Sequence, residues 1–380
     1  MTTNSIKWPG FLKAFAIIVL VAGVLASCQK DINSPQPMAD EPNNEQAAVN
    51  QARALEQTAP AEADQQAQAL GLNDLQNRNG SNRNIVQIAV SNPHFSSLVA
   101  AVVKTGLAGA LSDPSANLTV FAPTNAAFAQ LPAPFNNAGN INGISNTAQV
   151  DFLRNVLLYH VLGAEVFSNQ ISNGRSSAVT IKPAGSSNDN TVYFSKTFGL
   201  IRVNGQSTVI AANINANNGV IHAIDKVLLF PTATIAAIAI PNPNLSALVA
   251  ALVKTDLAGV FTGSGDFTVF APTNAAFAQL PAPFNNAANI SGISNPAQVT
   301  ALANILKYHV VSSRNFTWDL GILRQITTLA DGPGNKVTTI LGFNTGFVKG
   351  NDNNNFATAN PADILATNGV IHVINKVLLP

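Results

Sequence analysis

The sequence predicts an α+β protein built from two tandem copies of one domain, and two observations lead to this fold class. First, the stretch LTVFAPTNAAFAQLPAPFNNA from Leu118 returns as FTVFAPTNAAFAQLPAPFNNA from Phe267, about 150 residues later. A period of this length indicates a duplicated domain, because solenoid repeats are only roughly 20–50 residues long. Second, each copy shows helix-like apolar spacing at its start and strand-like stretches afterwards, the order of an α+β domain rather than of alternating βαβ units.

The first half of each copy is expected to be helical around one short strand. In the first copy, apolar residues over 94–111 recur every three or four positions, which is the pattern of an amphipathic helix. The run 118–123 reads as a short buried strand, and Thr124 or Asn125 then caps a short helix. A second amphipathic helix is expected over 147–162.

The second half of each copy is expected to form antiparallel strands. The turn Asn217-Asn218-Gly219 leads into the last of them. In the first copy we expect strands over 178–182, 191–195, 200–203, 207–212 and 220–229. The first helix of the second copy is expected to begin at about Thr232, directly after Phe230-Pro231. The two domains are therefore placed at 84–230 and 231–380, with almost no linker.

The first 27 residues have the character of a bacterial lipoprotein signal peptide. Lys7 and Lys13 precede the uncharged run 14–27, which is shorter than the about 20 apolar residues of a transmembrane helix. The run ends in Leu25-Ala26-Ser27-Cys28, which resembles a lipobox, where the cysteine is acylated and becomes the new N-terminus. Because Cys28 is the only cysteine of the chain, it is expected to be the lipid attachment point. The alternative is a stray cysteine in an ordinary signal peptide.

An acylated Cys28 predicts a membrane anchor without a transmembrane helix, since two acyl chains suffice for stable anchoring. The following Gln29-Lys30-Asp31 resembles the short signal that sends some bacterial lipoproteins to the outer face of the outer membrane; a periplasmic orientation is the alternative. Residues 28–83 are rich in Ala, Gln, Asn, Glu and Pro and are expected to form a disordered polar tether. Part of 46–70 has good helix formers and could be helical.

The composition excludes several function classes. Only 10% of the residues are charged and the net charge is +1, whereas nucleic-acid binding needs clustered Lys and Arg. A single cysteine allows neither a disulfide framework nor a cysteine-based zinc site. The sequence contains no nucleophile elbow, phosphate-binding glycine loop or His-Glu-x-x-His pattern. We therefore expect neither an enzyme nor a cofactor.

Three separated motifs occur in the same order in both copies. They are TVFAPTNAAF, a central Tyr-His pair, and NGVIHAIDKVLL from Asn218 or NGVIHVINKVLL from Asn368. Together they resemble the fasciclin-type adhesion domain, over residues 84–380. The resemblance implies a wedge-shaped β-sandwich with several packed helices in each copy, and a role in adhesion or matrix interaction rather than catalysis. Some animal members bind integrins through short acidic motifs, and no such motif is clear in the last strands of this sequence.

The motif histidines and tyrosines are the candidate site residues, and two interpretations of them stay open. The histidines lie on largely apolar faces, which favours a place in the core with local hydrogen bonds. The alternative is a metal pair, which would need a further ligand, or a proton-transfer pair. The tyrosines are candidates for ligand contact, although packing is favoured. These residues are Tyr159, His160 and His222 in the first copy, and Tyr308, His309 and His372 in the second.

These observations predict an outer-membrane lipoprotein at the cell surface that works in adhesion. Its expected partners are the membrane, through the lipid, and an extracellular protein, matrix or polysaccharide ligand. Loops rich in Asn, Ser and Thr suit hydrogen bonding to sugars or to a protein surface. The alternative is a periplasm-facing lipoprotein that binds a polysaccharide or solute for an uptake system, and an enzyme is the least favoured hypothesis.

Overall fold

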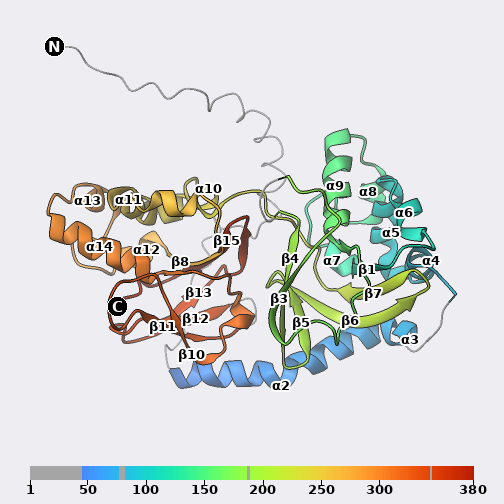
Figure 1. Ribbon diagram of the computed structural model, residues 1–380, viewed down its shortest axis with the longest axis horizontal. Coiled ribbons are helices and arrows are strands. Elements are labelled where there is room, and N and C mark those ends of the chain that lie inside the picture. The colour runs from blue at the N-terminus through green and yellow to red at the C-terminus, as the bar shows by residue number, and fades with distance from the viewer. Residues whose placement is uncertain (1–44, 77–81, 186–188, 343–344) are drawn as a thin grey trace, which may run out of the picture.

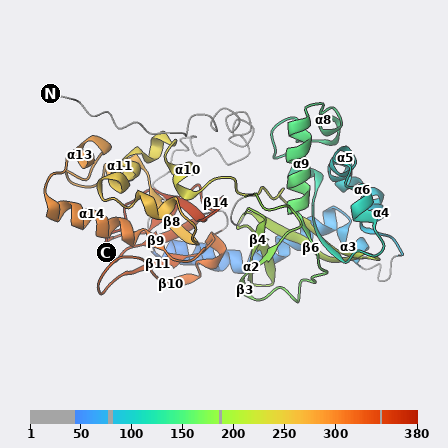
Figure 2. The same cartoon turned by 45° about the horizontal axis from the view of Figure 1, so that its top comes forward.

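The computed structural model describes residues 45–76, 82–185, 189–342 and 345–380. Two domains of mixed helices and strands lie side by side, and the long helix α2 (Glu45–Ala69) runs beneath both of them (Figure 1). The turned view in Figure 2 shows most helices of both domains on the side away from α2. The expected α+β class and the tandem arrangement are confirmed. The expected lipid site, Cys28, lies outside the described residues.

In the described part of the first domain, seven strands form one sheet in the order β2-β1-β7-β6-β5-β4-β3. The strands are β1 (Leu118–Pro123), β2 (Val161–Leu162), β3 (Gly174–Val179), β4 (Thr191–Thr197), β5 (Leu200–Val203), β6 (Ser207–Ala216) and β7 (Gly219–Ile224). The helices are α4 (Ile85–Ser91), η1 (Pro93–Phe95), α5 (Ser96–Lys104), α6 (Ala108–Ser112), α7 (Asn125–Phe128), α8 (Ala138–Asn142) and α9 (Thr147–Tyr159).

The second domain repeats this plan. Within its described residues, seven strands follow the order β10-β11-β12-β13-β15-β8-β9, and β14 pairs with β15 off this path. The strands are β8 (Phe267–Pro272), β9 (Val310–Val311), β10 (Ile322–Thr327), β11 (Lys336–Ile340), β12 (Gly346–Lys349), β13 (Ala357–Ala359), β14 (Ile364–Ala366) and β15 (Gly369–Ile374). The helices are α10 (Ile235–Ala239), η2 (Pro243–Leu245), α11 (Ser246–Lys254), η3 (Ala258–Phe261), α12 (Asn274–Phe277), α13 (Ala287–Ser291), α14 (Pro296–Tyr308) and η4 (Thr317–Asp319).

The first and last strands of each domain run parallel to one another. Strand β1 pairs with β7, and β8 pairs with β15, over six residues each. The expectation of purely antiparallel strands is therefore wrong for these pairs. A parallel pair needs a long crossover between its strands, and the helices and hairpins of the domain supply it. Each domain consequently places its first and last strands next to one another, with their starts side by side and their ends side by side.

A buried asparagine and a glycine fix this parallel pair. The side chain of Asn218 accepts the Ile85 amide at 2.9 Å and donates to the carbonyls of Leu111 and Asp113 at 2.9 and 3.1 Å. Gly219 follows with φ +143°, where a Cβ atom would clash with the carbonyl oxygen of Leu118 on β1. Only glycine allows this approach. The motif expected to be a turn thus also ties the first helix and α6 to the first strand.

The sheet of the first domain folds over so that its two ends face one another. Phe121 on β1 lies 5.5 Å from Phe194 on β4, measured between ring centroids. One buried cluster joins these rings to Val203 on β5 and Ile224 on β7. A second cluster packs α4, α5 and α9 on the other side of β1 and β7. This arrangement accounts for the expected sandwich with packed helices.

Local backbone chemistry moves several boundaries from their expected places. The helix expected over 94–111 is split into η1, α5 and α6, because the chain turns at Gly106 with φ +71°. The helix expected to reach residue 162 ends at Tyr159, and the next residues pair as β2. The second domain's first helix begins at Ile235 rather than about 232, because the Thr234 side chain caps it by accepting the Ala237 amide.

The interpretation of 28–83 as a disordered tether is wrong for the described part of this segment, whereas the helix considered for part of 46–70 is present as α2. Helix α2 places one stripe of small residues, including Ala52, Ala59 and Ala63, in a buried cluster with side chains of both domains. This cluster includes Leu200 of the first domain and Trp318 of the second. Alanine contributes little apolar area per residue, so the composition of residues 28–83 did not indicate a packed face. Alanine is also the best helix former, and its small side chain lets the helix lie close to both domains.

Both ends of this N-terminal segment are attached. At the start of α2, Glu45 pairs with Lys349 on β12 at 3.1 Å. The short helix α3 (Leu72–Gln76) follows α2 and packs Leu72 and Leu75 into the helical core of the first domain. The side chain of Gln76 donates to the Ala212 carbonyl on β6 at 2.6 Å. The segment is therefore a strap across both domains.

Replacing Ala52 by glutamate should release α2, because a carboxylate placed at this fully buried position loses its hydration without gaining a partner. The expected result is fast tryptic cleavage after Arg53, with both domains remaining folded. Ala54→Glu, on the exposed side of the same turn, is the matched control and should stay protected. Equal cleavage of the two variants would contradict the docking of α2.

Candidate functional site

The Tyr-His pairs stand at the ends of the two longest domain helices, α9 and α14, and their histidines are bonded to the backbone. The Nδ1 atom of His160 lies 2.6 Å from the Val156 carbonyl, and its Nε2 atom accepts the Leu228 amide at 2.8 Å. His309 makes the equivalent bonds, to Ile305 and from Leu378. This pattern requires the neutral ring with its proton on Nδ1. Burial lowers the pKa of both imidazoles to about 4.

The second histidine of each domain is bonded in the same manner. Nε2 of His222 lies 2.9 Å from the Val166 carbonyl, and its Nδ1 accepts the Asn213 amide at 3.2 Å. In the second domain, Asp363 lies 3.8 Å from His372 Nδ1, but both side chains are buried and this nitrogen already accepts the Asp363 amide. Burial lowers the pKa of His222 and His372. All four rings thus use both nitrogens on backbone groups.

The motif tyrosines are also internal. Tyr159 is fully buried, and its hydroxyl donates to the Thr191 carbonyl at 2.7 Å and accepts from the Asn204 side chain at 3.0 Å. Tyr308 is equally buried and donates to the Lys336 carbonyl. Burial raises the pKa of Tyr159 above its ordinary value. Each phenol thus joins the end of a helix to a strand across the core, and none is placed to touch a ligand.

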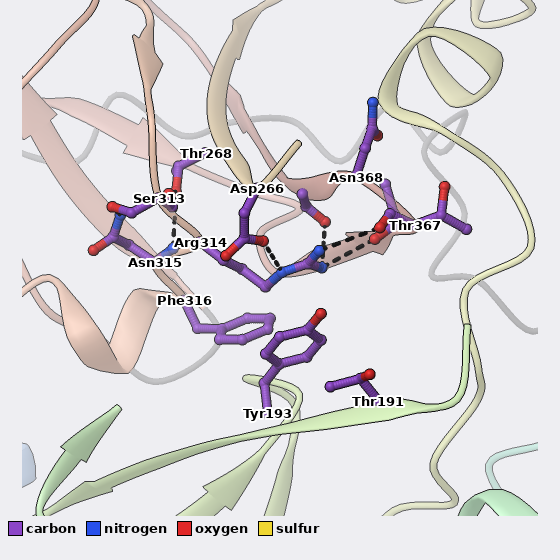
Figure 3. A network of polar contacts seen from close by, with 12 residues as sticks. Thr191, Tyr193, Asp266, Thr268, Ser313, Arg314, Asn315, Phe316, Thr367 and Asn368 are labelled. Carbon is purple, nitrogen blue, oxygen red and sulfur yellow. Dashed lines mark hydrogen bonds and ion pairs between the residues drawn. The ribbon is translucent and has the colours of Figure 1, made fainter. Parts of the chain in front are cut away.

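Arg314, which the sequence motifs did not point to, lies where the first and second domains touch (Figure 3). We call this contact between the two domains the domain seam. The Nε atom of Arg314 pairs with Asp266 at 2.7 Å, and its Nη1 atom donates to the carbonyls of Ala366 and Gly369 at 2.9 and 2.7 Å. The guanidinium carbon lies 4.2 Å from the ring centroid of Tyr193, which comes from β4 of the first domain. A desolvated cation over an aromatic face contributes roughly 2 kcal/mol. The signal for Arg314 was a departure from the repeat, since the corresponding position of the first copy is Glu165.

Further hydrogen bonds cross the seam. Nη1 of Arg175 on β3 donates to the Arg314 carbonyl and to the Asn315 side chain, both at 2.8 Å. The side chain of Gln206 donates to the Asp363 carbonyl at 2.7 Å. Helix α2 packs against both domains and these hydrogen bonds join them, so the two domains are held in one relative orientation.

A buried acid lies at the same seam. Asp319 in η4 is 8% exposed and accepts the Phe316 amide at 2.9 Å. Burial raises its pKa to about 6, and the hydrogen bond from the Phe316 amide offsets part of that rise. Its carboxylate is thus charged at neutral pH at a cost to the folded state.

Beside Asp319 the seam opens into a pocket of about 460 Å³. Its walls come from α2, from β3 and the end of β4, and from η4 and β10. Charged, aromatic and glycine residues line it. The arrangement can bind a small polar group by hydrogen bonds and van der Waals contact.

Two further findings concern the described ranges only. They contain no group of three or more His, Cys, Asp or Glu side chains that could share a metal ion. No single described helix has both the length and the apolar character to cross a membrane, although α4 and the bent continuation Pro93–Lys104 meet that standard when taken together.

The chain matches the fasciclin domain family twice, over residues 93–230 and 243–380. It is 28% identical over 269 residues to transforming growth factor-beta-induced protein ig-h3 of Sus scrofa, covering 70% of this chain and 35% of that protein. It is 40% identical over 147 residues to protein sll1483 of Synechocystis sp., covering 39% and 73%. It is 42% identical over 88 residues to the cell surface glycolipoprotein MPB83 of Mycobacterium bovis, covering 22% and 36%. The chain therefore spans about a third of the length of ig-h3.

Replacing His160 by alanine should destabilise the first domain by about 2–4 kcal/mol, because two buried backbone groups lose their partner and a cavity opens. Urea unfolding at pH 7.5 measures the loss. His94→Ala is the control, since His94 is only half-buried and its ring makes no hydrogen bond within the described residues. A stable His160→Ala protein with impaired ligand binding would contradict the structural role.

Lowering the pH from 6.5 to 4 should also destabilise the protein through this histidine. The folded state keeps His160 neutral down to a pKa of about 4, whereas the unfolded chain takes up a proton near pH 6.5. The stabilising effect is complete above pH 7 and falls by about 3 kcal/mol across this window. Unfolding curves of His160→Ala should show a correspondingly smaller pH dependence.

Replacing Asp319 by asparagine should stabilise the protein at neutral pH, whereas replacing His160 by alanine should destabilise it. The folded pKa of Asp319 is raised to about 6, so the charged form is penalised above that pH and stability is gained as the pH falls toward 4. The amide keeps the acceptor for Phe316 and removes the charge. We expect a higher melting temperature at pH 7.5, by several degrees, and no difference at pH 4. A lower melting temperature at pH 7.5 would contradict the assignment.

Proposed function

Because the chain belongs to the fasciclin domain family, we propose that it is a cell-surface adhesion protein that holds its partner by contact surfaces on two rigidly joined domains. The burial of the motif residues carries this proposal. Tyr159, His160, Tyr308 and His309 are at most 2% exposed and bonded to the backbone. Groups committed in this way are not free to perform acid–base or nucleophilic chemistry.

We propose further that Cys28 carries the lipid that anchors the protein to the outer membrane. The support is the sequence Leu25-Ala26-Ser27-Cys28 after an uncharged run, together with the similarity to a bacterial protein whose name is cell surface glycolipoprotein. The strap agrees with this arrangement, because α2, which follows Cys28 in the sequence, lies against both domains. A protein or polysaccharide outside the cell is the proposed partner.

The second candidate function is a periplasm-facing lipoprotein that binds a polysaccharide or solute for uptake. The polar pocket at the domain seam favours a small ligand of that kind. Both functions share the lipid anchor, and they differ in the side of the outer membrane on which the domains stand.

Replacing Cys28 by serine should move the protein from the membrane fraction to the soluble fraction, because the hydrocarbon of the anchor is lost. Immunoblots of fractionated cells measure the change, and His94→Ala is a control that should stay with the membrane. Protease added to intact cells should degrade the anchored protein when it faces outward and spare it when it faces the periplasm. A Cys28→Ser protein that still sediments with membranes would contradict the anchor.

A further inference from the structure

The pocket at the domain seam is assembled from three separate parts of the chain. Glu56 comes from α2, Arg175 from β3, and Arg324 from β10. Its volume of about 460 Å³ lies within the roughly 300–1,000 Å³ typical of small-molecule sites. Because no part builds the pocket alone, it exists only in the tandem arrangement with the strap in place.

Two guanidinium groups in the pocket wall are held by hydrogen bonds to backbone and side-chain oxygens. Arg175 is fixed through Nη1 on Arg314 and Asn315, and Arg324 is fixed through Nη1, which donates to the Asp319 carbonyl at 2.9 Å. Within the described residues, their Nε and Nη2 groups make no hydrogen bond. Each arginine is therefore positioned and still has donors for a ligand. A guanidinium offers a planar pair of N–H groups that matches a carboxylate.

The pocket also holds an acceptor and an aromatic surface. The carboxylate of Glu56 is half-buried and makes no ion pair among the residues described. The ring of Phe198 is 40% exposed and stands edge-on to Trp318, with centroids 6.1 Å apart. The negative face of an aromatic ring attracts weakly positive groups such as polarised C–H. Gly174 and Gly321 in the lining leave room for a ring to approach.

We propose that this pocket binds an acidic sugar residue of a polysaccharide. The two arginines take the carboxylate, Glu56 accepts from a ring hydroxyl, and Phe198 covers the C–H face of the sugar. Inorganic phosphate engages only the arginines, and a neutral sugar offers their remaining N–H groups no carboxylate. The assignment rests on the proposed function and gives the chemical class of its partner.

Isothermal titration calorimetry of the full chain in detergent tests the assignment. The ligands are trigalacturonic acid, maltotriose, which is also a trisaccharide, and inorganic phosphate. Trigalacturonic acid should bind, and the other two should bind at least about tenfold more weakly. Arg324→Ala and Phe198→Ala should each weaken trigalacturonic acid binding about tenfold or more, and Arg324→Lys should recover part of the loss. Arg154→Ala is the matched control, because it removes an equal charge from an exposed place on α9.

Three results would overturn the assignment: no binding of trigalacturonic acid at millimolar concentration, equal binding of maltotriose, or an equal loss in Arg154→Ala and Arg324→Ala. Melting curves of each variant show that it is folded before its binding is compared. The proposed function fails separately, in the fractionation of Cys28→Ser. If the anchor is found and trigalacturonic acid does not bind, only the pocket is wrongly assigned.

Discussion

The parallel pairing of the first and last strands is the constraint on which the rest of the structure depends. It is locked by Asn218 in one domain and by Asn368 in the other, each bonded to the first helix and to the loop that precedes the first strand. In the first domain the last strand ends at Ile224, beside Pro123 at the end of the first strand, and the first helix of the second domain already begins at Ile235. That short connection brings β4 of the first domain close to Arg314 of the second.

The two domains share one fold, and residues that differ between the two copies form the domain seam. The segment after the Tyr-His pair reads GAEVFSNQI from Gly163 in the first copy and SSRNFTWDL from Ser312 in the second. The second version contains Arg314, Trp318 and Asp319, which all lie at the seam. The histidines and tyrosines that the copies share maintain the core instead. In this protein, conservation between repeats accompanies folding, and divergence accompanies the contact between domains.

The sequence predicted what depends on local patterns. The repeat, the strand of TVFAP, the helix before the Tyr-His pair and the burial of His160 all follow from spacing and apolar character. The parallel pairing was missed because an Asn-Gly turn suggests a hairpin, while the bonds of Asn218 reach residues more than a hundred positions away. The strap was missed because a stripe of alanines carries little hydrophobic signal. The pocket was beyond prediction, since Glu56, Arg175 and Arg324 meet only through the tertiary fold.

The strap also determines how a pull on an anchored molecule would be carried. A force that acted on Glu45 along the axis of α2 would load a helix that lies lengthwise against both domains. Its contacts are then loaded together in shear rather than one after another, and resistance to a sustained pull depends on the rate at which they open. If the protein is anchored as proposed, a sustained pull would therefore be carried by the contacts of α2 before the domains themselves unfold.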